Sequence, residues 1–257
     1  MKSNKDKKDK LRENIRKAVD ISQRAQRNFD LSKQISQKDF ETLIYVATNS
    51  PSKQNETHFD LYVFTNQQKI REIYEQTKLF LLYDRKDNLE KVFGEKNGEF
   101  WQSDDRSVHN SQTLANMLFV YVENQGEARG GTHVQAQGEI NNAQSIVKYN
   151  EQISYSIGIS SGQVSMAAAM LGYKTGYCSA FKKGPVQDIC GTKKMPKLIV
   201  GIGYENVNVD RRQHAKTLNK DIPPDFKTGN DLEKWVFPSF AKEIDVYLNG
   251  KLYYNGN

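Results

Sequence analysis

Residues 150–173, NEQISYSIGISSGQVSMAAAMLGY, form the longest stretch of the sequence that follows one continuous pattern. Small residues, from Ser154 and Gly158 to Ala168 and Gly172, recur in it three or four positions apart, which is the spacing of one face of an α-helix. A helix face without large side chains lets a neighbour approach the backbone closely. The stretch therefore predicts a long helix with one bare face, which another helix would cover; a flat cofactor is the alternative.

Three further helices are predicted from periodicity and capping. Residues 10–26 roughly follow an amphipathic stripe. Ser36, with Asp39 three residues later, resembles a capping box; the apolar residues that follow recur at helical spacing, and Pro51 marks the end of that helix. Asn66 is a residue type that caps helix N-termini, so a short helix is expected after it.

Three segments are predicted to be strands because they are rich in β-branched and aromatic residues. They are HFDLYVFT (58–65), MLFVYVE (117–123) and LIVGIGY (198–204). Residues 124–150 are rich in glycine, asparagine and glutamine, which predicts a loop. Since helices and strands follow one another in mixed order, the sequence indicates an α+β or α/β fold in which helices cover a small sheet.

Composition excludes several classes of protein. The chain has 257 residues, 37% of them hydrophobic, and a mean hydropathy of −0.75. No apolar run approaches the ~20 residues that a membrane helix needs, and the charged start MKSNKDKKDK is unlike a secretory signal. Only two cysteines occur, Cys178 and Cys190, too few for a disulfide scaffold. We expect a cytoplasmic protein without a membrane partner.

The positive charge of the chain is concentrated at its N-terminal end. The formal net charge is +6 and the isoelectric point is about 9.0. Residues 1–18 hold eight lysines and arginines against three acidic residues, so this end alone carries +5. We expect residues 1–10 to be a flexible, solvated basic arm and expect no nucleic-acid partner. The alternative is a non-enzymatic binding module in which the arm contacts nucleic acid.

One short motif permits a hydrolase reading. Gly158–Gly162 matches G-x-S-x-G, the nucleophile elbow of serine hydrolases. Ser160 would be the nucleophile, His214 the base, and Asp188 or Asp210 the acid. The motif is short and occurs often by chance, and residues 1–157 hold fewer strands than that fold needs. Small residues in a packed helix are the other interpretation of the same pattern.

Two other patterns point to no site. Gly201-Ile202-Gly203 follows a predicted strand, but Asn206 stands where the dinucleotide-binding motif has its third glycine. The four histidines and two cysteines lack the spacing of zinc ligands. We therefore expect no metal.

Four segments, taken in order, carry a family resemblance. They are Arg24–Phe29 (RAQRNF), Pro51–Asn55 (PSKQN) before an aromatic strand, Met166–Tyr173 (MAAAMLGY), and Leu198–Tyr204 with Arg211 and Arg212 after it. Together they resemble the nitroreductase family of FMN-dependent oxidoreductases over roughly residues 10–215. The resemblance implies an α+β fold with a small, mostly antiparallel sheet and a homodimer with FMN at the subunit interface. It also implies NAD(P)H as hydride donor and an electron-poor acceptor such as a nitroaromatic or a quinone.

The resemblance also implies roles for individual residues. It assigns the FMN phosphate to Arg24, Arg211 and Arg212, and the negative charge of the reduced ring to Arg27. Ser52 and Asn55 would bind the ring edge or the ribityl chain. The turn Cys178-Ser179-Ala180 would present backbone N–H groups to flavin N5.

The sequence departs from the family at four places. Ala25 stands where a serine is usual, Ser179-Ala180 replaces a Glu-Gly pair, Tyr173 replaces a common leucine, and the aromatic residues 221–257 have no family counterpart. We expect residues 1–257 to form one domain. Its C-terminal extension, residues 221–257, would pack along the body or a partner subunit, since exposed aromatic rings are unfavourable.

Overall fold

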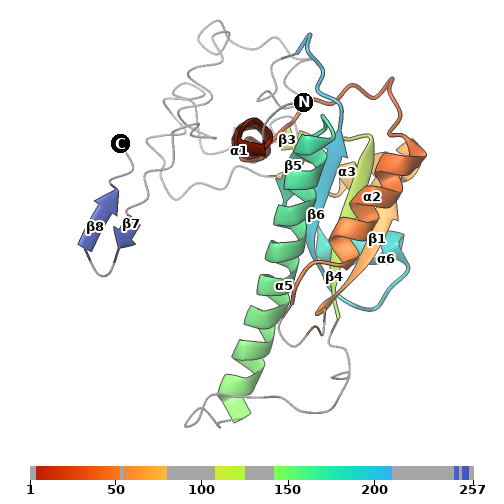
Figure 1. The fold of residues 1–257 in the computed structure, drawn as a ribbon. Coiled ribbons are helices and arrows are strands. Elements are labelled where there is room, and N and C mark those ends of the chain that lie inside the picture. The colour runs from red at the N-terminus through yellow and green to blue at the C-terminus, as the bar shows by residue number, and fades with distance from the viewer. Residues whose placement is uncertain are drawn as a thin grey trace, which may run out of the picture.

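The sheet at the centre of the molecule has four strands. The computed structural model describes residues 4–52, 55, 57–79, 108–124, 142–209, 246–248 and 251–254. In it the strands β1 (Phe59–Phe64), β4 (Met117–Glu123), β6 (Pro196–Gly203) and β5 (Lys174–Cys178) lie in the order β1-β4-β6-β5. Every neighbouring pair is antiparallel. The expected α+β fold with a small antiparallel sheet is confirmed (Figure 1).

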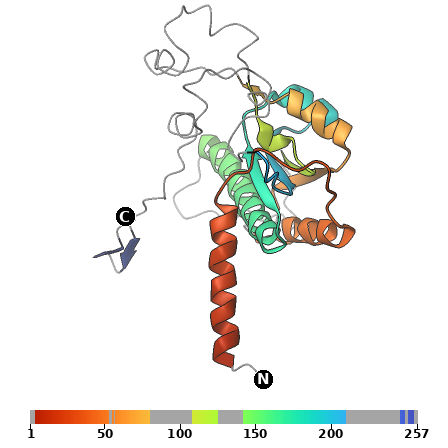
Figure 2. The ribbon, with the colours of Figure 1, turned by 90° about the horizontal axis from the view of Figure 1, so that it is seen from above.

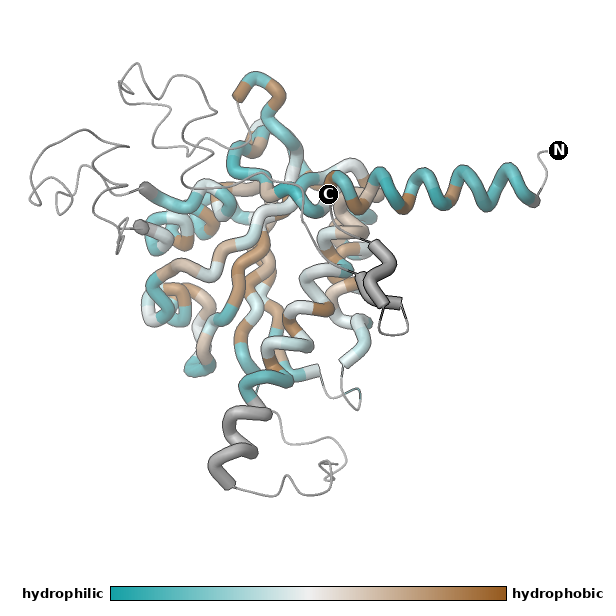
Figure 3. Tube along the Cα trace, turned by 90° about the vertical axis from the view of Figure 1, so that its left-hand side faces the viewer, coloured by the Kyte–Doolittle hydropathy of each residue, from teal (hydrophilic) through white to brown (hydrophobic). Residues whose placement is uncertain are grey.

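Helices cover both faces of this sheet (Figure 1). The central strand β4 determines the layering, because its side chains alternate between the faces. Its odd-numbered residues, with Tyr121 fully buried, pack against α2 (Gln37–Thr48) and α5 (Asn142–Met170). Its even-numbered residues pack against α3 (Gln67–Glu75) and α6 (Lys183–Cys190). The apolar strands between these helix layers are the brown tubes at the centre of Figure 3.

The predicted helix starts are confirmed by their caps. The side chain of Ser36 accepts a hydrogen bond from the N–H of Asp39 at the start of α2. The side chain of Asn66 accepts from two backbone N–H groups at the start of α3. Helix α5 covers the predicted 150–173 segment up to Met170, where Gly172 with φ of +88° ends it. It begins at Asn142, inside the segment that was expected to be a loop.

Helix α1 (Asn4–Ser22) projects from the body (Figure 2). Residues 4–10, which were expected to be a flexible arm, are the first turns of this helix. Oppositely charged side chains three positions apart, such as Asp9 and Arg12 at 2.7 Å, favour the helical state. Residues 5–17 are all exposed, as a solvated basic segment predicts, and Figure 3 shows the helix as mostly hydrophilic.

The remaining elements are short. A 3₁₀ turn, η4 (Ser111–Thr113), precedes β4, and β2 (Lys78–Leu79) pairs with β3 (Val108–His109). In the C-terminal extension β7 (Val246–Leu248) pairs with β8 (Lys251–Tyr254). The other residues of 221–257 lie outside the described part, so the packing of this extension stays a prediction.

Candidate active site

The segment that follows α1 runs along the edge strand β5. The N–H of Gln26 donates a hydrogen bond to the carbonyl of Thr175 at 2.8 Å. The N–H of Asn206 donates to the carbonyl of Asn28 at 3.2 Å. Gly176 makes this approach possible, because a Cβ atom there would lie 2.4 Å from the carbonyl oxygen of Gln26. The segment 24–29 is therefore fixed against β5 and the chain after β6.

Arg27 is the buried charge of this segment. The residue is 6% exposed, and it stands between Gln26, whose N–H is bonded to β5, and Asn28, whose carbonyl is bonded to the chain after β6. Arginines are almost never this buried unless their charge is compensated. Arg24, three residues earlier, is exposed. The edge of β5 thus carries one cation held in the interior and one in solvent.

The turn after β5 lies at the other end of the same strand. The thiol of Cys178 donates a hydrogen bond to the carbonyl of Ala180 at 3.3 Å, and burial raises the pKa of this thiol to about 11. Ser179 and Ala180 themselves are exposed. The structure therefore brings the Arg24–Arg27 segment and the Cys178–Ala180 turn, two groups predicted from distant parts of the sequence, to one edge strand.

Ser52 and Asn55 lie elsewhere in the chain's own fold. Their loop leads into β1, and the strands β4 and β6 separate β1 from β5. Within the loop, the hydroxyl of Ser52 accepts from the N–H of Thr57 at 2.9 Å, and the N–H of Asn55 donates to the carbonyl of Ser52 at 3.1 Å. A single chain thus leaves these residues at the opposite sheet edge from Arg27.

Four of the proposed site residues lie outside the described part of the chain. They are Arg211 and Arg212, which are assigned to the phosphate, His214, named as a base, and Asp210, named as an acid. Their roles stay predictions.

The hydrolase interpretation of Gly158–Gly162 is wrong. Ser160 lies within the unbroken helix α5 and is fully buried. Its hydroxyl donates to the carbonyl of Ala47 at 2.8 Å and lies 3.2 Å from the hydroxyl of Tyr121. A nucleophile elbow needs a sharp strand-to-helix turn that exposes the serine. Asp188 belongs to α6, on the other face of the sheet from α5.

The glycines of Gly201-Ile202-Gly203 make room for protein atoms. A Cβ atom at Gly201 would lie 2.0 Å from the carbonyl oxygen of Gln112, and one at Gly203 would lie 1.9 Å from Oδ1 of Asn116. Gly201 therefore lets η4 pack against the sheet, and Gly203 lets the side chain of Asn116 do so. This packing explains the motif without a bound phosphate.

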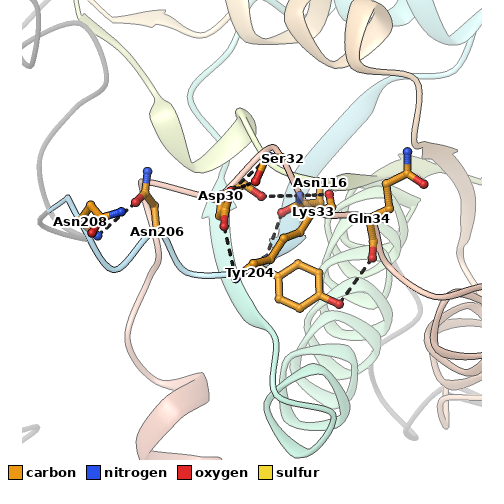
Figure 4. A network of polar contacts seen from close by, with 8 residues as sticks. All are labelled: Asp30, Ser32, Lys33, Gln34, Asn116, Tyr204, Asn206 and Asn208. Carbon is orange, nitrogen blue, oxygen red and sulfur yellow. Dashed lines mark hydrogen bonds and ion pairs between the residues drawn. The ribbon is translucent and has the colours of Figure 1, made fainter.

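Asn116 links the chain that follows Arg27 to the end of the sheet (Figure 4). No role was predicted for this residue from the sequence. Its Nδ2 donates to the carbonyls of Asp30 at 2.8 Å and Lys33 at 2.7 Å. Its Oδ1 accepts from the N–H of Tyr204 at 3.0 Å. The amide is thus bonded on both sides, and it holds the chain just after Arg27 against the end of β6. No pattern within the sequence marks this asparagine, because its partners are distant in the chain.

A tyrosine before β5 binds the start of α2. The hydroxyl of Tyr173 donates to Oδ2 of Asp39 at 2.7 Å, and the hydroxyl of Ser36 donates to the same oxygen at 2.8 Å. Both hydrogen bonds lower the pKa of Asp39, and the one from Tyr173 has the larger effect. Burial, followed by contacts with Tyr204 and Asp39, raises the pKa of Tyr173. The pair holds α2 and β5 together.

Helix α5 has its small residues on one face as predicted, and part of that face is covered. Ser161, Ser165, Ala168 and Ala169 are buried, and α1 contacts α5, as the expected helix neighbour would. Gly158 and Gly162 are exposed, and a Cβ atom at either would meet nothing within 4 Å. Tyr155 and Ile159 beside them are 63% and 42% exposed. This face is uncharged and apolar over two turns, and no described part of the chain covers the two glycines.

Neither a membrane span nor a metal site is found in the part of the chain that the structure describes. None of the helices there combines the length and apolar character that a membrane crossing needs. Nor do three or more histidine, cysteine, aspartate or glutamate side chains gather there in a group that could hold a metal ion.

Comparison with known proteins identifies the family. A model of the Nitroreductase family matches residues 21–204, more than half of the 257 residues. No curated protein matches the sequence significantly. The NADPH:FMN oxidoreductase of Vibrio harveyi, solved in complex with NAD+, shares the fold at 14% identity and a TM-score of 0.51, over 86% of this chain and 83% of that one. A putative NAD(P)H:FMN oxidoreductase of Staphylococcus epidermidis also shares it at 14% identity and a TM-score of 0.51, over 81% of this chain and 95% of that one. The resemblance carried by the ordered motifs is therefore confirmed, and the chain belongs to the nitroreductase family of oxidoreductases.

Proposed function

We propose that the protein is an FMN-dependent oxidoreductase. The observation that carries this proposal is the buried Arg27, fixed along the edge strand β5 that ends in the exposed Ser179–Ala180 turn. Two proteins with the same fold are described as FMN oxidoreductases that use NADPH or NAD(P)H. When bound, FMN would supply two-electron transfer, from NAD(P)H to an electron-poor acceptor such as a nitroaromatic or a quinone, in a ping-pong cycle.

The charges of the site fit this cofactor. FMN carries a phosphate dianion, which guanidinium groups bind well, and the exposed Arg24 is available for it together with Arg211 and Arg212. The reduced ring carries negative charge at N1 and O2. A buried cation such as Arg27 would stabilise that charge and raise the reduction potential.

The rest of the proposed contacts come from backbone and small side chains. Ser179 and Ala180 would present N–H groups to flavin N5 from the turn that Cys178 anchors. Ala25 contributes no hydroxyl, so the segment would hold the cofactor through its backbone and arginines. Ser52 and Asn55 would bind the ring edge or the ribityl chain.

We further propose a homodimer with a shared site. Ser52 and Asn55 lie at the opposite sheet edge from Arg27, so one chain does not gather the whole set. The bare face of α5, with Gly158 and Gly162 open, suits close packing against the same helix of a second copy. A two-fold axis there would make the contact self-complementary, and each copy would supply Ser52 and Asn55 to the other's flavin.

Two remaining assignments follow from charge and cysteines. Helix α1 is basic but carries acidic residues among its lysines, and we propose no nucleic-acid partner for it. Cys178 and Cys190 are both free thiols, which supports a cytoplasmic location.

The flavin spectrum tests this function. The purified protein should show the visible absorption of bound FMN or acquire it on titration with FMN. NADH or NADPH should then bleach this absorption without oxygen, and an added quinone should restore it. A colourless protein that takes up no FMN would end the proposal.

A further inference from the structure

Two serines of α5, Ser156 and Ser160, hold the two ends of the loop between α2 and β1. The hydroxyl of Ser160 donates to the carbonyl of Ala47 at 2.8 Å, where α2 ends. The hydroxyl of Ser156 is hydrogen-bonded to Nδ1 of His58 at 3.2 Å, just before β1. All four residues are at most 3% exposed. We call Ser156 and Ser160 the α5 serine pair.

The geometry of a helix makes this pair rigid. Residues four apart lie one above the other on a single helix face, so one straight element contacts both ends of the loop. Tyr121 supports the arrangement from β4, because its hydroxyl lies 3.2 Å from that of Ser160. The distance between the two ends of the loop is therefore determined by α5 and not by the loop itself.

The loop between these ends adopts an unfavourable backbone conformation. Asn55 has φ of +59° and Thr57 has φ of +48°, a region that residues other than glycine rarely occupy. Such conformations persist when the surroundings constrain them. Here the N–H of Thr57 donates to the hydroxyl of Ser52, and the ends are held by the α5 serine pair.

The opposite face of α5 is the bare one. At 3.6 residues per turn, Gly158 and Gly162 point roughly away from Ser156 and Ser160. The helix that holds the loop on one side thus offers its other side to a second copy. Ser52 and Asn55 are thereby placed relative to the proposed subunit interface by one rigid element.

We propose that Ser156 and Ser160 are positioning residues for FMN, which act by holding Ser52 and Asn55 in their binding conformation. This inference rests on the proposed function. It also accounts for the G-x-S-x-G motif, since Ser160 is required as a buried donor to Ala47 in place of a nucleophile. A loop ordered before binding saves the ordering entropy that a mobile loop would lose on binding.

The double variant S156A/S160A tests this role, with S161A as the matched control. Ser161 lies in the same helix and is 2% exposed, but its hydroxyl donates to Gly158 within α5 and does not reach the loop. In the protein without FMN, amide hydrogen exchange of peptides covering residues 49–58 should become at least about tenfold faster in S156A/S160A than in S161A. FMN affinity should fall about tenfold in the double variant, and S161A should bind as the wild type does.

Unchanged exchange in S156A/S160A would overturn the positioning role. If S156A/S160A exchanges faster but binds FMN with wild-type affinity, the α5 serine pair orders the loop without affecting the cofactor, and its role in FMN binding would be overturned. A wild type that binds no FMN, with exchange still faster in the double variant, would refute the proposed function but leave the role of the α5 serine pair in ordering the loop. If the double variant does not fold, S156A alone carries the same comparison, because it keeps the bond from Ser160 to Ala47.

Discussion

The side-chain amide of Asn116 lies so close to Gly203 that a Cβ atom at position 203 would fall 1.9 Å from Oδ1. The same amide binds Asp30, Lys33 and Tyr204. Because the chain between Arg27 and Lys33 is attached to the sheet through this amide, the shape of the candidate site depends on the absence of a side chain at the end of β6.

The substitution Gly203→Ala should destabilise the protein. The added methyl group would displace Asn116 or the ring of Phe29, whose Cδ1 would lie 3.0 Å away, and overpacking of this kind costs roughly 1–3 kcal/mol. Urea unfolding measures the change. Gly184→Ala in α6 is the control, since a Cβ atom there meets nothing within 4 Å and alanine favours a helix. Equal stability of the two variants would contradict the close contact.

Arg27→Ala should weaken FMN binding and slow flavin reduction more than it lowers folding stability. The guanidinium is buried in a segment whose backbone bonds to Thr175 and Asn206 remain, so the local fold has other support. A drop of at least about tenfold in FMN affinity is expected for loss of a charged contact. Arg16→Ala, at an exposed position of α1, should change neither the FMN affinity nor the rate of flavin reduction. Equal destabilisation of the apo and FMN-bound protein, with unchanged FMN affinity, would oppose the assigned role.

The double substitution Gly158→Lys and Gly162→Lys should convert the proposed dimer into a folded monomer. Both positions are open in the single chain, and lysine favours a helix over glycine by roughly 0.5–1 kcal/mol per residue, so the monomer should not lose stability. Across a two-fold axis the lysines would face their own copies. Analytical ultracentrifugation measures the mass. Gly184→Lys on α6 serves as the control, and a wild type that is already monomeric would contradict the shared site.

Tyr173→Phe should produce a stability loss that depends on pH. The hydrogen bond from Tyr173 lowers the pKa of Asp39 in the folded state. A lowered folded-state pKa contributes stability above the unfolded pKa of about 4, and this contribution disappears as the pH falls through the folded value. The difference in unfolding free energy between wild type and Y173F should therefore be present at neutral pH and shrink below about pH 4. Tyr45→Phe, at a residue that is 67% exposed, should show no such pH-dependent difference.

Both thiols should react slowly in the native protein. Burial raises the pKa of Cys178 and of Cys190 to about 11, and only the thiolate is nucleophilic. Alkylation by iodoacetamide near pH 8 should be on the order of a hundredfold slower than in the urea-unfolded chain, and slower at the buried Cys178 than at the half-buried Cys190. Mass spectrometry over time measures both rates.

Local sequence patterns predicted the elements whose formation depends on residues close in the chain. The caps at Ser36 and Asn66 act within one helical turn, and the apolar run 117–123 is strand β4 in full. Strand β5 was missed because KTGYC lacks a strand-like pattern, and its pairing with β6 makes it a strand. Helix α6 was not predicted, because its N-cap residue Lys182 makes no capping hydrogen bond with its side chain and gives no start signal.

The sequence alone predicted the small-residue face of α5 and the family, because periodicity and ordered motifs can be recognised in the order of the residues. The tertiary structure decided which part of that face stays open, since it buries Ser161 and Ala168 and leaves Gly158 and Gly162 exposed. Only the tertiary structure decided what individual residues contact. It made Ser160 a buried donor to Ala47, made Gly203 the place where Asn116 reaches the sheet, and separated Ser52 from Arg27 by two strands. The reason is that these relationships join residues far apart in the chain. They exist only after the strands have paired and the helices have packed on them.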